Sequence, residues 1–179
     1  MDTLSKRQNH INKCLIIIDM QVGIFNLKQP VFNREVLIEN INSLITYFRN
    51  QNFSIIFTQH ENKSFLIKNS SNWAIIPELI KNDKDIIIYK SYPSIFEETM
   101  LEEKLNEINS KNLFICGLIT NGCVQQACID AFEKGYNVTL LSDSHSTFNK
   151  NPEKIITTYN NKLKEMGVKL TDTLSLLSQ

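Results

Sequence analysis

Short apolar runs alternate along the chain with segments of helical periodicity, and this alternation restricts the fold more than any other feature. The run "CLIIID" (14–19) is apolar at almost every position, as in a strand buried on both faces of a sheet. The segment "REVLIENINSLITYFRNQ" (34–51) instead places apolar residues at helical spacing. Such alternation predicts one α/β domain, a Rossmann-like three-layer α-β-α fold with a mostly parallel six-stranded sheet.

The remaining elements follow from the same patterns. Gly135 stands where a helix commonly ends, and Pro152 stands in the first turn of another. Further strands are expected at 53–59, 85–89, 112–118, 136–143 and 168–173, and further helices at 101–109, 122–135 and 151–167.

The composition is that of an ordinary globular domain without a charge bias. Of 179 residues, 42% are hydrophobic, and 19 acidic residues balance 19 basic ones. We divide the chain into a polar N-terminal leader (1–12) and one domain (13–179). Balanced charge gives no reason to expect a nucleic-acid partner, and no apolar run approaches the roughly 20 residues that span a bilayer. The leader lacks the apolar core of a secretory signal, so we expect a cytoplasmic protein without a membrane partner.

Three of the four cysteines, Cys116, Cys123 and Cys128, are close together in the chain. Their spacing, C-x6-C-x4-C, matches no zinc-binding pattern, and no histidine pair stands nearby at ligand spacing. In a reducing compartment a disulfide is not expected either. Cys116 falls within an apolar strand and Cys128 lies about one helical turn after Cys123. We therefore expect these two, together with Cys14, to be structural, and we expect no metal and no cofactor.

Topology singles out three reactive side chains. Asp19 ends the first strand, Lys90 follows the third, and Cys123 follows the fourth at the start of a helix. In open α/β sheets, ligands bind outside the carboxyl ends of the strands. The three side chains are therefore expected to meet at one edge of the sheet.

Their chemistry is that of an acyl-transfer hydrolase. The thiolate is the nucleophilic form of cysteine, and a helix N-terminus and a nearby lysine both favour it. Asp19 could accept the thiol proton and return it to a leaving amine, while backbone N–H groups of the turn before Cys123 could face an oxyanion. Simpler interpretations stay open: Cys123 as a small buried apolar residue, Asp19 as a strand end, and Lys90 as a solvated lysine.

Four blocks of the sequence, in this order, resemble the isochorismatase-like cysteine hydrolases, a family that includes nicotinamidases. The resemblance runs from about Cys14 to Asp172. The blocks are "CLIIIDMQVGIF", "IIFTQH", "IIIYKSYPSIFEETMLEEKL" and "LFICGLITNGCVQQACIDAFEKGYNVTLLSDSHSTF".

The resemblance implies a catalytic triad of Asp19, Lys90 and Cys123. It also implies a cis peptide bond between Leu118 and Ile119, with the Ile119 and Cys123 amides facing the oxyanion. Members of the family usually form homo-oligomers, so a dimer or tetramer is expected. The substrate would be a small molecule with an amide (C–N) or related acyl bond.

The chain departs from the nicotinamidase pattern after the second strand. Those enzymes resemble one another in an Asp-x-His metal motif, whereas this chain reads "TQHENKSF" from Thr58. A nicotinamidase-type metal centre is therefore not expected. A cysteine nucleophile also favours C–N chemistry over cleavage of the isochorismate vinyl ether. Two alternatives remain: a vinyl-ether hydrolase that does not need Cys123, and a redox-sensitive thiol with Cys128 or Cys116 as its partner.

Several other residues are candidates for substrate contact or support. Gln21 resembles a position that supports the catalytic aspartate, and His60 is either a substrate contact or structural. The irregular segment 62–77 is a candidate to pack over the site. His145 and Ser146 are expected to contact a subunit or fix a loop, and Asn121 to cap the following helix. The walls of an apolar pocket are predicted to come from Phe25, Trp73, Tyr92 and Phe96.

Overall fold

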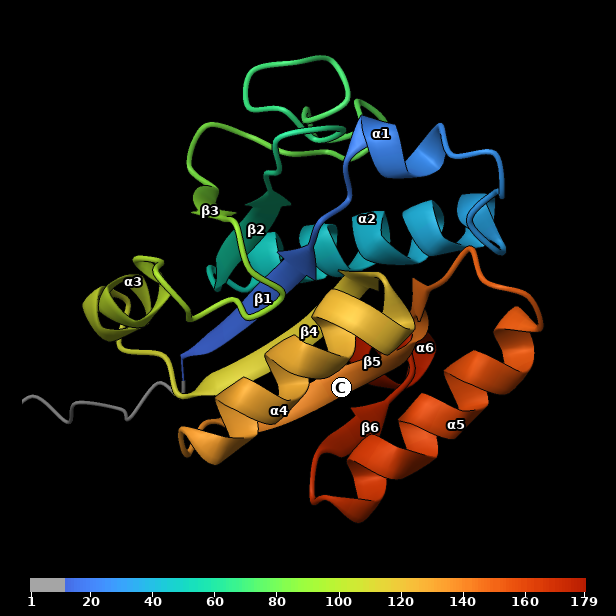
Figure 1. Ribbon diagram of the computed structural model, residues 1–179. Coiled ribbons are helices and arrows are strands. Elements are labelled where there is room, and N and C mark those ends of the chain that lie inside the picture. The colour runs from blue at the N-terminus through green and yellow to red at the C-terminus, as the bar shows by residue number, and fades with distance from the viewer. Residues whose placement is uncertain (1–11) are drawn as a thin grey trace, which may run out of the picture.

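A computed structural model describes residues 12–179, so the predicted leader lies, except for its last residue, outside the described residues. The core is a six-stranded sheet in the order β3-β2-β1-β4-β5-β6, with every pair parallel (Figure 1). The predicted α/β fold is confirmed. The strands are β1 (Lys13–Ile18), β2 (Ser54–His60), β3 (Ile86–Lys90), β4 (Asn112–Leu118), β5 (Asn137–Ser146) and β6 (Lys169–Thr171).

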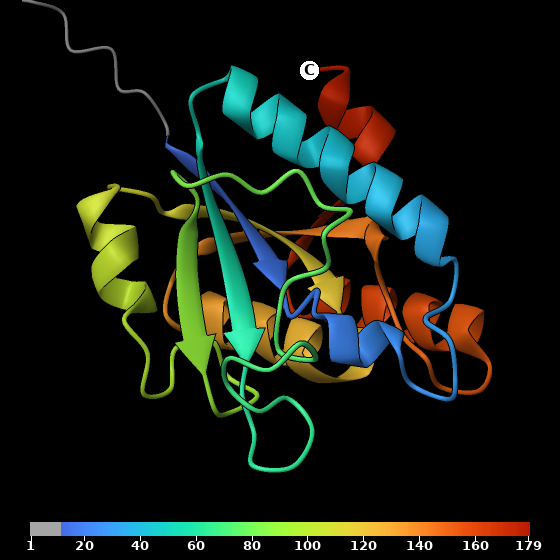
Figure 2. The ribbon, with the colours of Figure 1, turned by 90° about the horizontal axis from the view of Figure 1, so that it is seen from above.

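Helices cover both faces of the sheet, as its apolar strands require. One face carries α1 (Val22–Phe25), α2 (Arg34–Asn50) and α6 (Thr173–Leu177). The other face carries α3 (Leu101–Glu107), α4 (Gln125–Glu133) and α5 (Pro152–Glu165). Figure 2 shows the sheet as the middle layer between α2 and α6 on one side and α4 and α5 on the other.

Side chains alternate between the two cores along the central strand β1. Leu15 and Ile17 pack with α2, whereas Cys14, Ile16 and Ile18 pack with α3 and α4. Each of these five side chains is fully buried, and burial of an aliphatic side chain contributes about 1.5–3 kcal/mol. This two-sided burial explains why the run is apolar without alternation.

Two elements extend or interrupt the predicted pattern beside the site. Strand β5 continues to Ser146, three residues past the predicted end, and its register against β4 shifts between Ile115 and Gly117. The predicted helix at 122–135 begins later, with α4 at Gln125, because an irregular turn, η1 (Thr120–Val124), precedes it. Gly122 has φ −145° and ψ −113° there, which no helix allows. The helices α1 and α6 were not predicted.

The irregular segment after β2 is tied to the end of β1. The N–H groups of Val22 and Gly23 donate to the carbonyls of Ala74 and Asn72, both at 2.8 Å. The Ile76 N–H donates to the Met20 carbonyl at 3.0 Å. The segment therefore lies at the carboxyl edge toward which the strand arrowheads point in Figure 2.

Candidate active site

The carboxyl edge of the sheet brings together one carboxylate, one ammonium group and one thiol. Lys90 Nζ lies 2.7 Å from Asp19 Oδ2 and 3.3 Å from Cys123 Sγ. It also donates to the Tyr92 carbonyl at 3.3 Å. The Lys90 and Asp19 side chains are 0% and 2% exposed, whereas Cys123 is partly exposed. The lysine thus stands next to both the acid and the sulfur, and only the sulfur reaches the surface.

Asp19 is fixed by a threonine on the neighbouring strand. It follows β1 with φ 47°, an uncommon value for a residue other than glycine. Its backbone N–H donates to Thr58 Oγ1 at 3.1 Å, and the Thr58 hydroxyl donates to Asp19 Oδ1 at 2.6 Å. One carboxylate oxygen therefore faces Thr58 and the other faces Lys90. Thr58 was missed in the sequence, where its only signal is its place in the "TQH" block.

A glycine sets the spacing between the two halves of the site. Gly117 has φ 111°, and a Cβ atom there would lie 2.3 Å from the Ile18 carbonyl oxygen. Only glycine permits this backbone conformation together with so close an approach. Because Asp19 directly follows Ile18 and the turn that carries Cys123 begins soon after β4, the contact brings Asp19 and Cys123 near one another.

Cys123 lies in the turn η1, two residues before α4 begins. The Leu118–Ile119 peptide bond that precedes the turn is cis. The Ile119 carbonyl accepts hydrogen bonds from the Gly122 N–H at 3.0 Å and from the Val124 N–H at 3.2 Å. These bonds fold the turn tightly around the cysteine.

Burial and the charges of Asp19 and Lys90 together determine the pKa of the Cys123 thiol. Burial first, and then the Asp19 charge, raise the pKa of this thiol to about 12, against the lowering effect of Lys90. Lys90 acts on this pKa in the expected direction, but burial and the Asp19 charge outweigh it. Burial alone would lower the pKa of Lys90, but the Asp19 carboxylate raises it overall.

The other three cysteines are free and lie in the core. Cys14, Cys116 and Cys128 are each 0% exposed. Burial raises the pKa of all three thiols, which makes them poor nucleophiles. Their structural role was expected.

Gln21, which follows β1, is hydrogen-bonded to His60 at the end of β2. The Gln21 side chain is fully buried; its Nε2 donates to the His60 carbonyl at 2.9 Å and its Oε1 accepts from the His60 N–H at 2.9 Å. It therefore joins β1 to β2 and holds the backbone of His60. His60 is paired with Lys90 in the β2–β3 register, and burial, followed by the Lys90 charge, lowers the pKa of its imidazole.

Phe25 and Trp73, predicted as pocket walls, each pack against other residues. The Trp73 ring packs on Tyr89 with centroids 5.2 Å apart. Neighbouring residues of a strand point to opposite faces of the sheet, so the Tyr89 and Lys90 side chains lie on opposite faces. Phe25 packs with the core on the α2 side, and the Arg34 guanidinium lies 5.4 Å above its ring.

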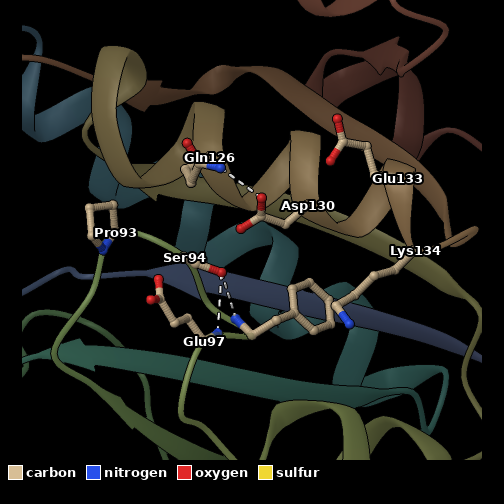
Figure 3. A pocket seen from close by; sticks show the side chains of 8 residues that line it. Pro93, Ser94, Glu97, Gln126, Asp130, Glu133 and Lys134 are labelled. Carbon is tan, nitrogen blue, oxygen red and sulfur yellow. Dashed lines mark hydrogen bonds between the residues drawn. The ribbon is translucent and has the colours of Figure 1, made fainter.

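Tyr92 and Phe96 follow β3 but lie in different places. The Tyr92 carbonyl contacts Lys90, as described above. Phe96 stacks on Tyr136, which follows the C-terminal end of α4, whereas Cys123 precedes the N-terminal end. Phe96 also lines a pocket of about 590 Å³ between the loop after β3 and the outer face of α4 (Figure 3), in which Gln126 Nε2 donates to Asp130 Oδ1 at 2.6 Å. The residues that line it are Pro93, Ser94, Phe96, Glu97, Gln126, Asp130, Glu133 and Lys134.

The described residues do not offer a group of side chains that fits a metal centre. Within residues 12–179, no three His, Cys, Asp or Glu side chains are grouped so that they could hold a metal ion. His60 is followed by Glu61 and Asn62 rather than by a second histidine. As for the membrane, none of the described helices combines the length and the apolar character needed to cross a bilayer.

Comparisons with known proteins agree with this architecture. The Isochorismatase domain model matches residues 13–173. Nicotinamidase 3 of Arabidopsis thaliana is 26% identical over 165 residues, covering 83% of this chain and 80% of that protein. The uncharacterized isochorismatase family protein YrdC of Bacillus subtilis is 32% identical over 141 residues, covering 76% and 74%.

A solved structure supports the same assignment. The crystal structure of an isochorismatase family protein superposes with a TM-score of 0.85 at 26% identity, covering 90% of this chain and 98% of that one. The family model matches nearly the whole described chain, and the relatives match along most of their own length. The chain therefore belongs to the isochorismatase family of hydrolases.

Proposed function

We propose that the protein is a cysteine hydrolase that cleaves the C–N bond of a small amide through a thioester acyl-enzyme. One observation carries the proposal: Lys90 Nζ contacts both the Asp19 carboxylate and the Cys123 sulfur in a site closed to solvent on the acid side. A protonated thiol, a buried carboxylate and an ammonium group form a complete set for general-base activation of a nucleophile.

The reaction has two halves. In the first, Asp19 takes the thiol proton as Cys123 Sγ attacks the amide carbonyl, and the tetrahedral oxyanion accepts hydrogen bonds from the Ile119 and Cys123 amides. Asp19 then gives that proton to the leaving nitrogen, the C–N bond breaks and an amine departs. In the second half, Asp19 removes a proton from water as the water oxygen attacks the thioester carbonyl, the C–S bond breaks to release the acid, and Asp19 returns the proton to the Cys123 sulfur. Lys90 stabilises Asp19 and the sulfur while charge moves between them.

The substrate enters from the open side of the sulfur. His60 is paired with Lys90 between β2 and β3, and the Tyr92 carbonyl accepts a hydrogen bond from Lys90 Nζ. Because both residues lie next to Lys90, we assign them to the substrate side of the site. Gln21 supports the site indirectly, because its side chain holds the backbone of His60. The name of the plant relative, nicotinamidase, makes an aromatic carboxamide a reasonable first substrate to test.

The test is ammonia release from a panel of small primary amides, including nicotinamide and pyrazinamide. Wild type is compared with Cys123→Ala and with the core control Cys128→Ala. Turnover by wild type and Cys128→Ala, with loss in Cys123→Ala, is the expected result. Hydrolysis of isochorismate that survives in Cys123→Ala would instead assign the vinyl-ether reaction and refute the amidase.

A further inference from the structure

The turn that carries Cys123 is held from one side by residues at the end of β5. Thr120 Oγ1 lies 2.8 Å from His145 Nδ1, and Thr147 Oγ1 donates to Asn121 Oδ1 at 3.0 Å. Thr120 and His145 are 1% and 3% exposed, so water does not compete for their contact. The contact is possible because β5 extends to Ser146 and its register against β4 shifts between Ile115 and Gly117.

The direction of the Thr120–His145 hydrogen bond follows from the other side of the imidazole. His145 Nε2 lies 2.8 Å from Asn160 Oδ1. The Asn160 amide is oriented by its own Nδ2, which donates to the Ser142 carbonyl at 3.1 Å. Because an amide oxygen only accepts, Nε2 carries the hydrogen of the neutral ring. Nδ1 is then the acceptor, and the Thr120 hydroxyl donates to it.

We propose that His145, oriented by Asn160, is a positioning residue that holds Cys123 at its working distance from Lys90 through Thr120. Thr120 sits directly after Ile119 and three residues before Cys123, so it lies between the two amides assigned to the oxyanion. Gly122 has non-helical backbone angles in this turn. The hydrogen bond between Thr120 and His145 therefore fixes the turn, where a regular helix would be fixed by its backbone hydrogen bonds. The inference rests on the proposed function only in naming Cys123 the nucleophile.

The alternative is a buried polar network that stabilises the fold without acting on the sulfur. The two accounts differ in what happens to the thiol when one hydroxyl is removed. If Thr120 positions the turn, its loss lets Cys123 leave the buried place beside Asp19 and Lys90, and the thiol then behaves like an exposed one. If the network only stabilises, the chemistry of the thiol stays as it is.

The experiment is the pH profile of Cys123 alkylation by iodoacetamide, followed by peptide mass spectrometry. Thr120→Val removes the hydroxyl and keeps the branched shape, whereas Thr120→Ser keeps the hydroxyl. Thr173→Val is the matched control, because Thr173 is also buried and bonded to β5, through Ser144 and Asp143, but lies away from the turn. All variants are assayed where circular dichroism shows them folded.

We expect Thr120→Val to move the profile toward that of an ordinary thiol and to speed alkylation at pH 8 about tenfold, an effect of the size expected for one buried hydrogen bond. Thr120→Ser and Thr173→Val should match wild type. Asn160→Ala, at a partly exposed site, should shift the profile in the same direction if Thr120→Val fails to fold. A Thr120→Val profile equal to wild type, or an equal shift in Thr173→Val, would overturn the proposal. Because no turnover is measured, this result is independent of the amide test.

Discussion

The Lys90 ammonium group lies 2.7 Å from Asp19 Oδ2, and both side chains are shielded from solvent. Burial of these two charges removes their hydration free energy. The attraction between the charges, together with the hydrogen bonds to Thr58 and Tyr92, offsets this loss. Such a pair adds little net stability compared with apolar residues, but removing one partner leaves the other buried and uncompensated.

Replacing Lys90 with methionine should destabilise the protein strongly. The Asp19 carboxylate would stay buried without its counter-ion, which costs about 3–5 kcal/mol in the free energy of unfolding. Urea denaturation measures the change. The double variant Asp19→Asn/Lys90→Met should recover part of the loss. Lys104→Met, which breaks an exposed pair with Glu107, should change the midpoint little. Equal effects of the two lysine substitutions would refute the buried-pair account.

Replacing Asp19 with asparagine should make the Cys123 thiol more acidic while it slows turnover. After burial, the Asp19 charge is the next cause of the raised Cys123 pKa, about 12. Its removal should therefore lower that pKa and move the iodoacetamide profile to lower pH. Turnover should nevertheless fall by about 10²–10⁴, since the general base is gone. If turnover rises together with thiol acidity, Asp19 is not the base.

Stability should decline as the pH falls below about 6.5, the ordinary pKa of histidine. Burial lowers the pKa of His145 in the folded state, so the unfolded chain binds protons first and is favoured as pH decreases toward the folded pKa. The Asn160 hydrogen bond and then the Asp143 charge oppose this shift, and Glu153 on α5 faces the same cavity as His145. Unfolding midpoints in urea at pH 7.5 and 5.0 should differ less in His145→Gln than in wild type.

The lowered pKa of His60 acts with the same sign. His60→Gln, measured in parallel, reports its separate share of the pH dependence. An identical slope in wild type and in both variants would show that neither histidine is held neutral by the fold.

Gly117→Ala should be among the most harmful single-methyl additions in the chain. The new Cβ would meet the Ile18 carbonyl oxygen at 2.3 Å, at φ 111°. Overpacking and backbone strain together cost roughly 2–5 kcal/mol. Gly135→Ala is the matched control, because Gly135 also has a positive φ, 81°, but nothing lies within 4 Å of its added Cβ. Strain alone there costs about 1 kcal/mol. Thermal unfolding of the two variants compares them directly.

The layer order of the fold could be predicted from the sequence because it depends on patterns that repeat over many residues. Fully apolar strands such as 14–18 have only one stable environment, between two layers of helices. The same topology predicts that Asp19, Lys90 and Cys123 share an edge, and the structure places them in contact.

Details decided by single contacts could not be predicted in this way. The start of α4 at Gln125 depends on the conformation of Gly122, and the continuation of β5 depends on a register shift beside Gly117. The pairing of Thr58 with Asp19 joins residues 39 positions apart. The raised pKa of Cys123 results from burial, which the helix-start position does not reveal.

The central claim, that Cys123 is the nucleophile of an amide hydrolase, is tested most directly by trapping the acyl-enzyme. Wild-type protein is mixed with each amide that releases ammonia, quenched in acid within one turnover, and digested for mass spectrometry. The account predicts the acyl group of the amide as a thioester on the peptide that contains Cys123, and neither adduct nor ammonia in Cys123→Ala. Ammonia release that continues at the wild-type rate in Cys123→Ala would contradict it.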